Sequence, residues 1–262
     1  MGWWVLAILA VVQGLTEFLP ISSSGHLVIG ASLLGPPSES FDVAEITIAL
    51  HVGTLLSILV YYRRRIVRLA GRDRGAVRSV VVGTIPAVLV GVPVEMWWED
   101  FLESPLIAGL MLLVTGCILL GMRRPAAGDG DYPQMSVGDA WWVGLAQAAA
   151  ILPGLSRSGS TIFAGTRRGL RPQAAATFSF LLAIPAIAGA GLLKAASMVA
   201  KGTPPMTPWS HLLGGVAISF VVGLAALAWL VAWLEQGRIW WFALWCLPLG
   251  VLVTGGALAG WL

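Results

Sequence analysis

The sequence predicts an all-α integral membrane protein built from two repeats of inverted topology, and three observations support this fold class. First, 57% of the 262 residues are hydrophobic and only 11% are charged, whereas soluble domains carry roughly a quarter charged residues. Second, apolar runs near 20 residues recur, and this length crosses a bilayer core of ~30 Å as a helix. Third, two polar interruptions recur at one sequence offset. A lipid-exposed open sheet is excluded because lipid cannot satisfy its edges.

Uninterrupted apolar runs predict the transmembrane helices. Each run is long enough to span, and its ends are marked by charged residues, glycine, proline or tryptophan. We expect six such helices, at about 43–62, 76–94, 105–122, 173–193, 211–233 and 239–261.

Two further apolar regions, residues 3–35 and 141–166, are interrupted by polar residues and proline. Each half is too short to span comfortably, so each region is expected to form a broken or re-entrant hairpin. The interrupting residues are Gln13, Glu17, Pro20, Ser22, Ser23, Ser24 and His26 in the first region and Gln147, Pro153, Gly154, Ser156, Arg157 and Ser158 in the second.

The two interrupted regions are related by an offset of 134 positions, and three apolar runs follow each one. The offset carries Gln13 to Gln147, Ser22 to Ser156, Ser24 to Ser158 and Gly25 to Gly159. We therefore expect one membrane domain over residues 1–262, with repeat one at 1–124, a polar linker at 125–137 and repeat two at 138–262. A hairpin plus three spans gives odd parity, so the second repeat is inverted, as in transporter-like folds whose site lies between the repeats.

The basic residues agree with this topology. Alternation of the spans places thirteen arginines on one side and only Lys194 and Lys201 on the side of the termini. Positive residues concentrate on the cytoplasmic side, so a multi-pass plasma-membrane protein with both termini on the outer face is expected. The one basic residue left over is Arg157, inside the second interrupted region.

Arg157 and Glu17 are the charged residues at predicted membrane depth. A charge at the bilayer centre costs roughly 2.5–3.5 kcal/mol on insertion scales, so such residues usually face a cavity and a partner. One interpretation is a structural Arg157–Glu17 ion pair that joins the repeats. The other is an anion clamp, because a guanidinium group binds phosphate oxygens bidentately.

Serine-rich helix starts strengthen the second interpretation. Serine is a good N-cap, and two helix N-termini aimed at one point would bind an anion. Plain capping is the alternative, although it does not account for the added arginine and histidine. The candidate phosphate-binding residues are Ser22, Ser24, Gly25, Ser156, Ser158, Gly159 and Thr161.

The first interrupted region also holds candidates for chemistry. Gln13 and Glu17 share a helix face and could hold a divalent cation together with substrate phosphate, or simply form a polar contact in the bundle. His26 is a candidate acid or base that would assist Ser23 as a nucleophile or activate water; a hydrogen-bonded core histidine is the alternative. His51 is interpreted as a packing residue and Gln147 as a structural mirror of Gln13.

The segments at 13–26 (QGLTEFLPISSSGH) and 153–161 (PGLSRSGST) resemble the two signature segments of the bacitracin-resistance family of undecaprenyl-diphosphate phosphatases. The stretches at 41–65 and 178–185 resemble that family too, so the likeness covers nearly the whole chain. The first motif of the family commonly opens with glutamate, where this chain has Gln13.

The resemblance implies hydrolysis of a C55 polyprenyl diphosphate to the monophosphate at the outer face of the plasma membrane, with Mg²⁺ or Ca²⁺ as a cofactor. The product is the lipid carrier of cell-wall glycan synthesis, and the activity confers bacitracin resistance. The implied roles are Glu17 as metal ligand or acid/base, Ser23 as nucleophile or phosphate ligand, His26 as its partner and Arg157 as the diphosphate clamp. Ser156, Ser158 and Thr161 would be phosphate ligands, and Gln13 would leave the metal with one carboxylate fewer.

Two other functions compete with the phosphatase. Inverted repeats also suit a flippase for polyprenyl phosphates, which needs the anion clamp but no hydrolytic pair. A non-catalytic scaffold leaves the cost of the buried polar residues unexplained. The expected partners are the polyprenyl diphosphate and membrane lipids, not nucleic acid, and the oligomeric state is left open.

Overall fold

A computed structural model describes residues 2–34, 42–97, 99–123, 128–200, 202 and 206–262 of the chain. Within these ranges the regular structure is helical, apart from one isolated bridge between Gly130 and Leu170. The elements are α1 (Trp3–Thr16), α2 (Ser23–Leu34), α3 (Val43–Tyr61), α4 (Arg63–Leu69), α5 (Arg74–Trp97), α6 (Glu99–Leu102), α7 (Pro105–Gly121), η1 (Tyr132–Gln134), α8 (Val137–Ala149), α9 (Arg157–Arg167), α10 (Pro172–Ala200), α11 (Trp209–Glu235), η2 (Ile239–Phe242) and α12 (Ala243–Leu258).

Five segments among the described residues are long and apolar enough to cross a membrane: α3, α5, α10, α11 and the continuous η2–α12 segment. They correspond to five of the six predicted runs, and the all-helical, multi-span class is confirmed. The sixth run forms α7, an apolar helix of 17 residues. At 1.5 Å per residue α7 is about 25 Å long, so its full crossing stays a prediction.

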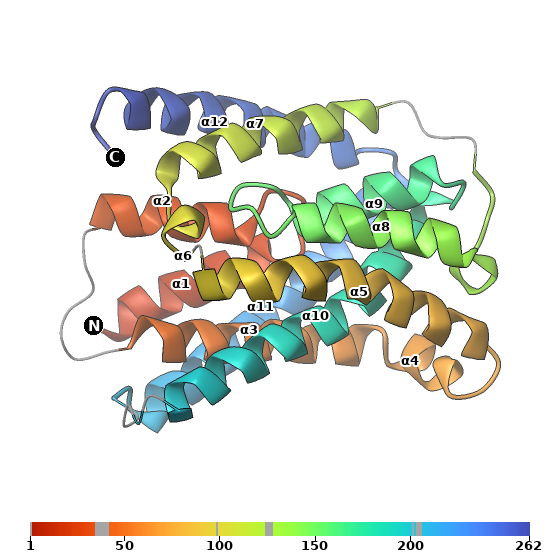
Figure 1. Ribbon diagram of the computed structural model, residues 1–262. Helices are drawn as coiled ribbons and strands as arrows, with labels where there is room; N and C mark the ends of the chain where they lie inside the picture. The colour runs from red at the N-terminus through yellow and green to blue at the C-terminus, as the bar shows by residue number, and fades with distance from the viewer. Residues whose placement is uncertain (1, 35–41, 98, 124–127, 201, 203–205) are drawn as a thin grey trace.

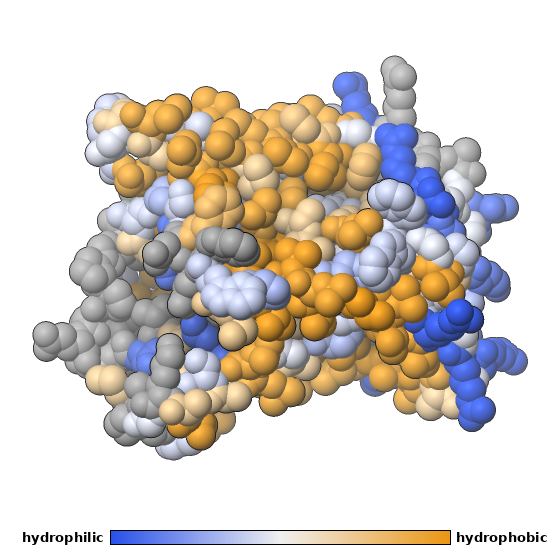
Figure 2. All heavy atoms as spheres, viewed as in Figure 1, coloured by the Kyte–Doolittle hydropathy of each residue, from blue (hydrophilic) through white to orange (hydrophobic). Residues whose placement is uncertain are grey.

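The outer surface of the molecule suits lipid rather than water. Large apolar side chains such as Val199, Leu252 and Leu258 are more than 70% exposed, and an apolar surface of this extent is not tolerated by a soluble monomer. Figure 2 shows apolar residues over the middle of the molecule and hydrophilic ones gathered at the end where α4 lies. Both termini lie at the opposite end (Figure 1).

The helices pack in pairs that bring distant parts of the sequence together. Helix α7 packs on α12, α3 on α11, α5 on α8, and α1 on α11. Small residues allow this close approach, as in other membrane bundles: a Cβ on Gly14 of α1 would lie 2.8 Å from Val222 Cβ of α11. The centre is occupied by α10, in which residues 174–183 are all buried, so this stretch of the helix contacts protein on every side.

Each of the two interrupted regions contains two short helices joined by a loop. The first loop joins α1 to α2 and the second joins α8 to α9. Because proline and positive-φ residues stop the helical hydrogen-bond ladder, Pro20 with Ser22 and Pro153 with Gly154 account for where these helices end. The two loops are the framework of the site.

Candidate functional site

The first loop reaches the second through Ser22. This residue has φ of 70°, a left-handed conformation that costs free energy for a residue other than glycine. Its hydroxyl accepts the backbone N–H of Gly25 at 3.3 Å and of Gly154 at 3.1 Å. A Cβ on Gly25 would lie 2.8 Å from Gly154 Cα, so the backbones of the two loops touch and only glycine fits there.

The second loop is held by a residue from another helix. Thr115 of α7 donates its hydroxyl to the carbonyl of Gly154 at 2.8 Å and accepts the N–H of Ser156 at 2.9 Å. Ser156 is the N-cap of α9, because its hydroxyl accepts the N–H of Gly159 at 3.2 Å. Arg157 is the first residue of α9, and its position is fixed by the contacts of Thr115 with the loop and by the N-cap Ser156.

Glu17 joins the two loops chemically. Its buried carboxylate accepts hydrogen bonds from Gln13 Nε2 at 3.0 Å and Ser23 Oγ at 2.8 Å. It also pairs with Arg157 Nη2 at 2.5 Å, across 140 residues of sequence. The structural ion pair that the sequence allowed is thus formed, and it brings Ser23 and Arg157 to one carboxylate.

A cavity of about 410 Å³ opens beside this carboxylate. Several buried polar atoms at the cavity have no partner within the described part of the chain: Arg157 Nη1 and both polar atoms of the Gln147 side chain. Unsatisfied buried polar groups are costly, and anionic oxygens would satisfy the two donors, Arg157 Nη1 and Gln147 Nε2. The polar lining consists of Thr16, Glu17, Ser22, Ser23, Ser24, His51, Thr84, Gln147, Ser156 and Arg157, with apolar walls from α5 and α10.

The two histidines of the first repeat differ in their surroundings. His26 lies outside the residues that line the cavity; its Nδ1 is 2.7 Å from the carbonyl of Ser22, and its Nε2 accepts the indole N–H of Trp245 at 2.9 Å. His51 lines the cavity, with Nδ1 donating to the carbonyl of Thr47 at 2.8 Å. His51 Nε2 lies 3.9 Å from Glu17 Oε2.

Comparison with known proteins matches nearly the whole chain to one family model. The family model described as "Bacitracin resistance protein BacA" matches residues 6–252. The chain belongs to this family. It is 48% identical over 249 residues to the undecaprenyl-diphosphatase of Rhodopirellula baltica, covering 95% of this chain and 96% of that one. It is 38% identical to the undecaprenyl-diphosphatase of Desulfatibacillum aliphaticivorans, covering 97% and 98% of the two chains.

The cavity is lined by some of the predicted site residues. Glu17, Ser22, Ser23, Ser24, Ser156 and Arg157 line the cavity, whereas Gly25, His26, Ser158, Gly159 and Thr161 do not. Thr161 instead donates to the carbonyl of Arg157 at 2.7 Å and contacts Ser179 Oγ at 2.6 Å, and Ser158 contacts Ser156. Thr161 and Ser158 therefore make contacts within and around the start of α9 and do not line the cavity. The two ring nitrogens of His26 contact the carbonyl of Ser22 and the indole of Trp245, while Ser23 Oγ donates to Glu17.

Three residues at the site were not predicted as functional: His51, Gln147 and Thr115. His51 and Gln147 are polar residues in apolar stretches, and the insertion cost that singled out Arg157 applies to them as well. That signal could have found them. Thr115 carries no such signal, because a threonine in a transmembrane helix commonly bonds to its own backbone.

The residues present do not fit a resident divalent cation. Among the described residues no three His, Cys, Asp or Glu side chains are placed to hold a metal ion. Both oxygens of Glu17 already accept hydrogen bonds, and one of its partners is the Arg157 cation. Gln13 Oε1 is buried without a partner and is a single neutral donor for a metal. A cation at this site would need most of its ligands from elsewhere.

Proposed function

We propose that this chain hydrolyses undecaprenyl diphosphate to undecaprenyl phosphate and inorganic phosphate. This reaction would regenerate the lipid carrier for cell-wall glycan synthesis and confer bacitracin resistance. The single observation that carries the proposal is the meeting of Arg157, Ser23 and Glu17 at one cavity within an apolar helix bundle. The names of the similar full-length proteins give independent support.

The contacts favour a serine nucleophile. Ser23 donates its hydroxyl proton to Glu17 at 2.8 Å, which is the arrangement of a nucleophile beside its base. In the proposed reaction Ser23 Oγ attacks the terminal phosphorus, its proton passes to Glu17, and the bond to the bridging oxygen breaks to release the lipid monophosphate. Water then attacks the phosphorus of the phosphoserine, and the bond to Ser23 Oγ breaks as Glu17 returns its proton to that oxygen. The inorganic phosphate keeps one proton of the water and the other passes to solvent.

Arg157 and Gln147 are the proposed hydrogen-bond donors to the phosphate. Phosphoryl transfer is accelerated mainly by positioning and electrostatic stabilisation. Arg157 Nη1 and Gln147 Nε2 have no partner among the described residues, so we assign them to the non-bridging phosphate oxygens. Because Arg157 Nη2 is held by Glu17, the guanidinium group is oriented before substrate arrives.

Phosphate release from undecaprenyl or farnesyl diphosphate in detergent tests this function. Ser23→Ala and Arg157→Ala should each lower kcat/KM by about 10²-fold or more. Two exposed residues provide matched controls: Ser32→Ala, whose hydroxyl bonds to its own helix, and Arg171→Ala, which loses an exposed pair with Asp131. Unchanged release by the Ser23 and Arg157 variants would refute the site, and covalent phosphate on Ser23 after rapid quenching would separate a serine nucleophile from activated water.

A divalent cation, Mg²⁺ or Ca²⁺, is proposed to arrive with the diphosphate, since this chain offers few ligands of its own. Removing metal with a chelator should then raise KM for the diphosphate and leave the thermal midpoint of the substrate-free protein unchanged. A chelator-induced fall in that midpoint would instead indicate a resident ion.

The inverted arrangement is likewise proposed, with residues 1–124 and 138–262 as repeats and α1–α2 and α8–α9 as re-entrant hairpins. Its support is the contact between the two loops and the gathering of hydrophilic residues at the end opposite the termini, where the arginine-rich helix α4 lies. We propose that the arginine end is cytoplasmic and that the cavity opens to the outer face of the plasma membrane.

A further inference from the structure

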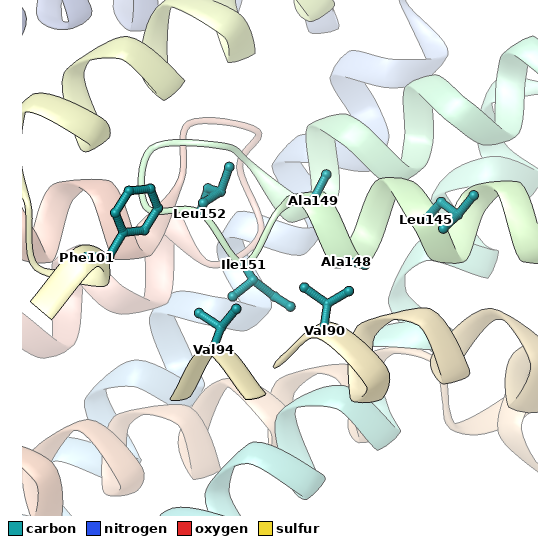
Figure 3. Close-up of a pocket in the computed structure, with 8 residues that line it drawn as sticks. All are labelled: Val90, Val94, Phe101, Leu145, Ala148, Ala149, Ile151 and Leu152. Carbon is teal, nitrogen blue, oxygen red and sulfur yellow. The ribbon is translucent and has the colours of Figure 1, made fainter. Parts of the chain in front are cut away.

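A second hollow lies beside the polar cavity. It is a groove of about 510 Å³ between α5 and α8, and α6 contributes Phe101 to it. Its lining is entirely apolar: Val90, Val94, Phe101, Leu145, Ala148, Ala149, Ile151 and Leu152. Figure 3 shows Ile151 of the second loop beside Val94 and Val90 of α5, with Leu152 on the side of Phe101. The groove carries no group for chemistry, so its occupant is apolar.

The groove and the polar cavity share a wall. Ile151 lines both of them. On α5, Val90 and Val94 line the groove, while Val88, Gly91 and Val92 line the cavity. A Cβ on Gly91 would lie 3.3 Å from Ile151 Cδ1, so Gly91 leaves room at the junction. The two hollows are therefore neighbours, so a ligand with a charged head in the cavity could lay an apolar tail past Ile151 into the groove.

The groove also faces the surrounding lipid. Val90 is 43%, Phe101 48% and Leu145 38% exposed, so apolar side chains at the groove are open to the surroundings of the protein. A long apolar chain that enters the groove can thus continue into the bilayer without crossing the protein, so the length of the chain is not limited by the groove.

We propose that this groove binds the isoprene units nearest the diphosphate of a polyprenyl substrate, while the diphosphate lies in the polar cavity. The proposal rests on the phosphatase function proposed above and assigns its lipid specificity to α5, α6 and α8. The competing occupant is the acyl chain of an ordinary membrane lipid. The position of the groove next to the phosphate cavity, with Ile151 in both linings, favours the substrate, because binding of head and tail at neighbouring sites adds their contributions.

Filling the groove tests the proposal. Ala149 is exposed, lines the groove and does not line the cavity, so Ala149→Phe occupies the tail site and leaves the phosphate ligands in place. The matched control is Ala225→Phe, at an exposed position of α11 that lines neither hollow. Phosphate release is measured with farnesyl diphosphate and with methyl diphosphate, which has no isoprene unit.

Ala149→Phe should lower kcat/KM for farnesyl diphosphate at least about ten-fold, mainly through KM, and change that for methyl diphosphate less than about two-fold. Ala225→Phe should change neither. Equal effects of Ala149→Phe on both substrates, or no effect, would overturn the groove as a tail site. Should this variant fail to fold, Ala149→Leu and Phe101→Ala must shift the same substrate ratio. A wild-type chain that releases phosphate from neither substrate overturns the proposed function itself.

Discussion

At the scale of single residues, the Glu17–Arg157 pair has two roles that mutation can separate. The pair is mostly buried, with 6% and 15% of the two side chains exposed. Removing one member of such a pair leaves an uncompensated charge, which typically costs about 3–5 kcal/mol, whereas replacing both is often neutral. Stability and catalysis therefore depend on the pair in different ways.

Arg157→Met alone should lower both the thermal midpoint and phosphate release. The double variant Glu17→Gln, Arg157→Met should recover the midpoint but not the activity. It leaves no unpaired charge, but it lacks both the arginine that binds phosphate and the carboxylate that accepts the proton of Ser23. Thermal unfolding in detergent and the phosphate assay measure the two effects. A double variant as unstable as the single one would show that the pair does not hold the loops together.

The contacts of the two histidines predict different substitution patterns. Asparagine places its amide near the position of Nδ1 and glutamine near that of Nε2. His26 Nδ1 holds the carbonyl of the strained Ser22, so His26→Asn should retain more activity than His26→Ala, which should lose about five- to ten-fold with one hydrogen bond. His51 Nε2 faces Glu17, so His51→Gln should retain more than His51→Asn.

Phosphate release at a fixed pH ranks these four variants. His211→Gln, at the histidine stacked on Trp3, is the control that should behave as wild type. If His26→Asn and His26→Ala are equally inactive, His26 takes part in the chemistry directly, as the family resemblance implies, and its role is not limited to positioning Ser22.

At the scale of elements, two glycines with positive φ, in the α8–α9 loop and between α9 and α10, separate conformational strain from steric clash. Gly154 has φ of +91°, and an added Cβ would meet the backbone of Ala108. Gly169 has φ of +90° with nothing within 4 Å of an added Cβ. Gly169→Ala therefore reports conformational strain alone, and Gly154→Ala reports strain plus a steric clash.

Gly169→Ala should destabilise the protein by about 1 kcal/mol, and Gly154→Ala should destabilise it by more and abolish phosphate release, since it separates the two loops. Chemical denaturation in mixed micelles measures the difference. Equal destabilisation by both substitutions would mean that the α7 contact is not tight.

Predicted and observed elements differ mainly at their ends. The apolar run at 173–193 lies within α10, which continues to Ala200, and the run at 76–94 lies within α5, which begins at Arg74 and ends at Trp97. Hydropathy marks the part of a helix that lies in hydrocarbon, whereas backbone hydrogen bonds continue beyond it. The sequence therefore locates spans better than it locates helix ends.

At the scale of the whole molecule, the arrangement of the repeats makes a prediction about sidedness. Arg68 on α4 and Glu103 between α6 and α7 are both exposed. Cysteine replacements at these positions, with Cys117→Ala to reduce background, should label from opposite sides of intact cells with an impermeant maleimide. We expect Glu103→Cys to react outside and Arg68→Cys to react only after lysis. Because α5 lies between the two positions, labelling of both from one side contradicts the proposed topology of residues 1–124.

The sequence by itself determined the chemistry that this protein has available and where it is encoded. The apolar runs predicted the spans, because hydrocarbon accepts few other patterns, and the cost of burying charge singled out Glu17 and Arg157. These are local rules, so they can be read from the order of residues. They could not say whether Arg157 would pair with Glu17 or remain free, nor which histidine would reach the cavity.

Only the tertiary structure decided these points. It turned His26 toward Trp245, brought His51 to Glu17, and used Thr115 of α7 to hold the second loop. It also placed an apolar groove against the polar cavity by packing α5 on α8. The physical reason is that the partner of a side chain depends on how each helix is rotated and on how segments far apart in sequence pack together. Neither can be predicted from the residues of one segment.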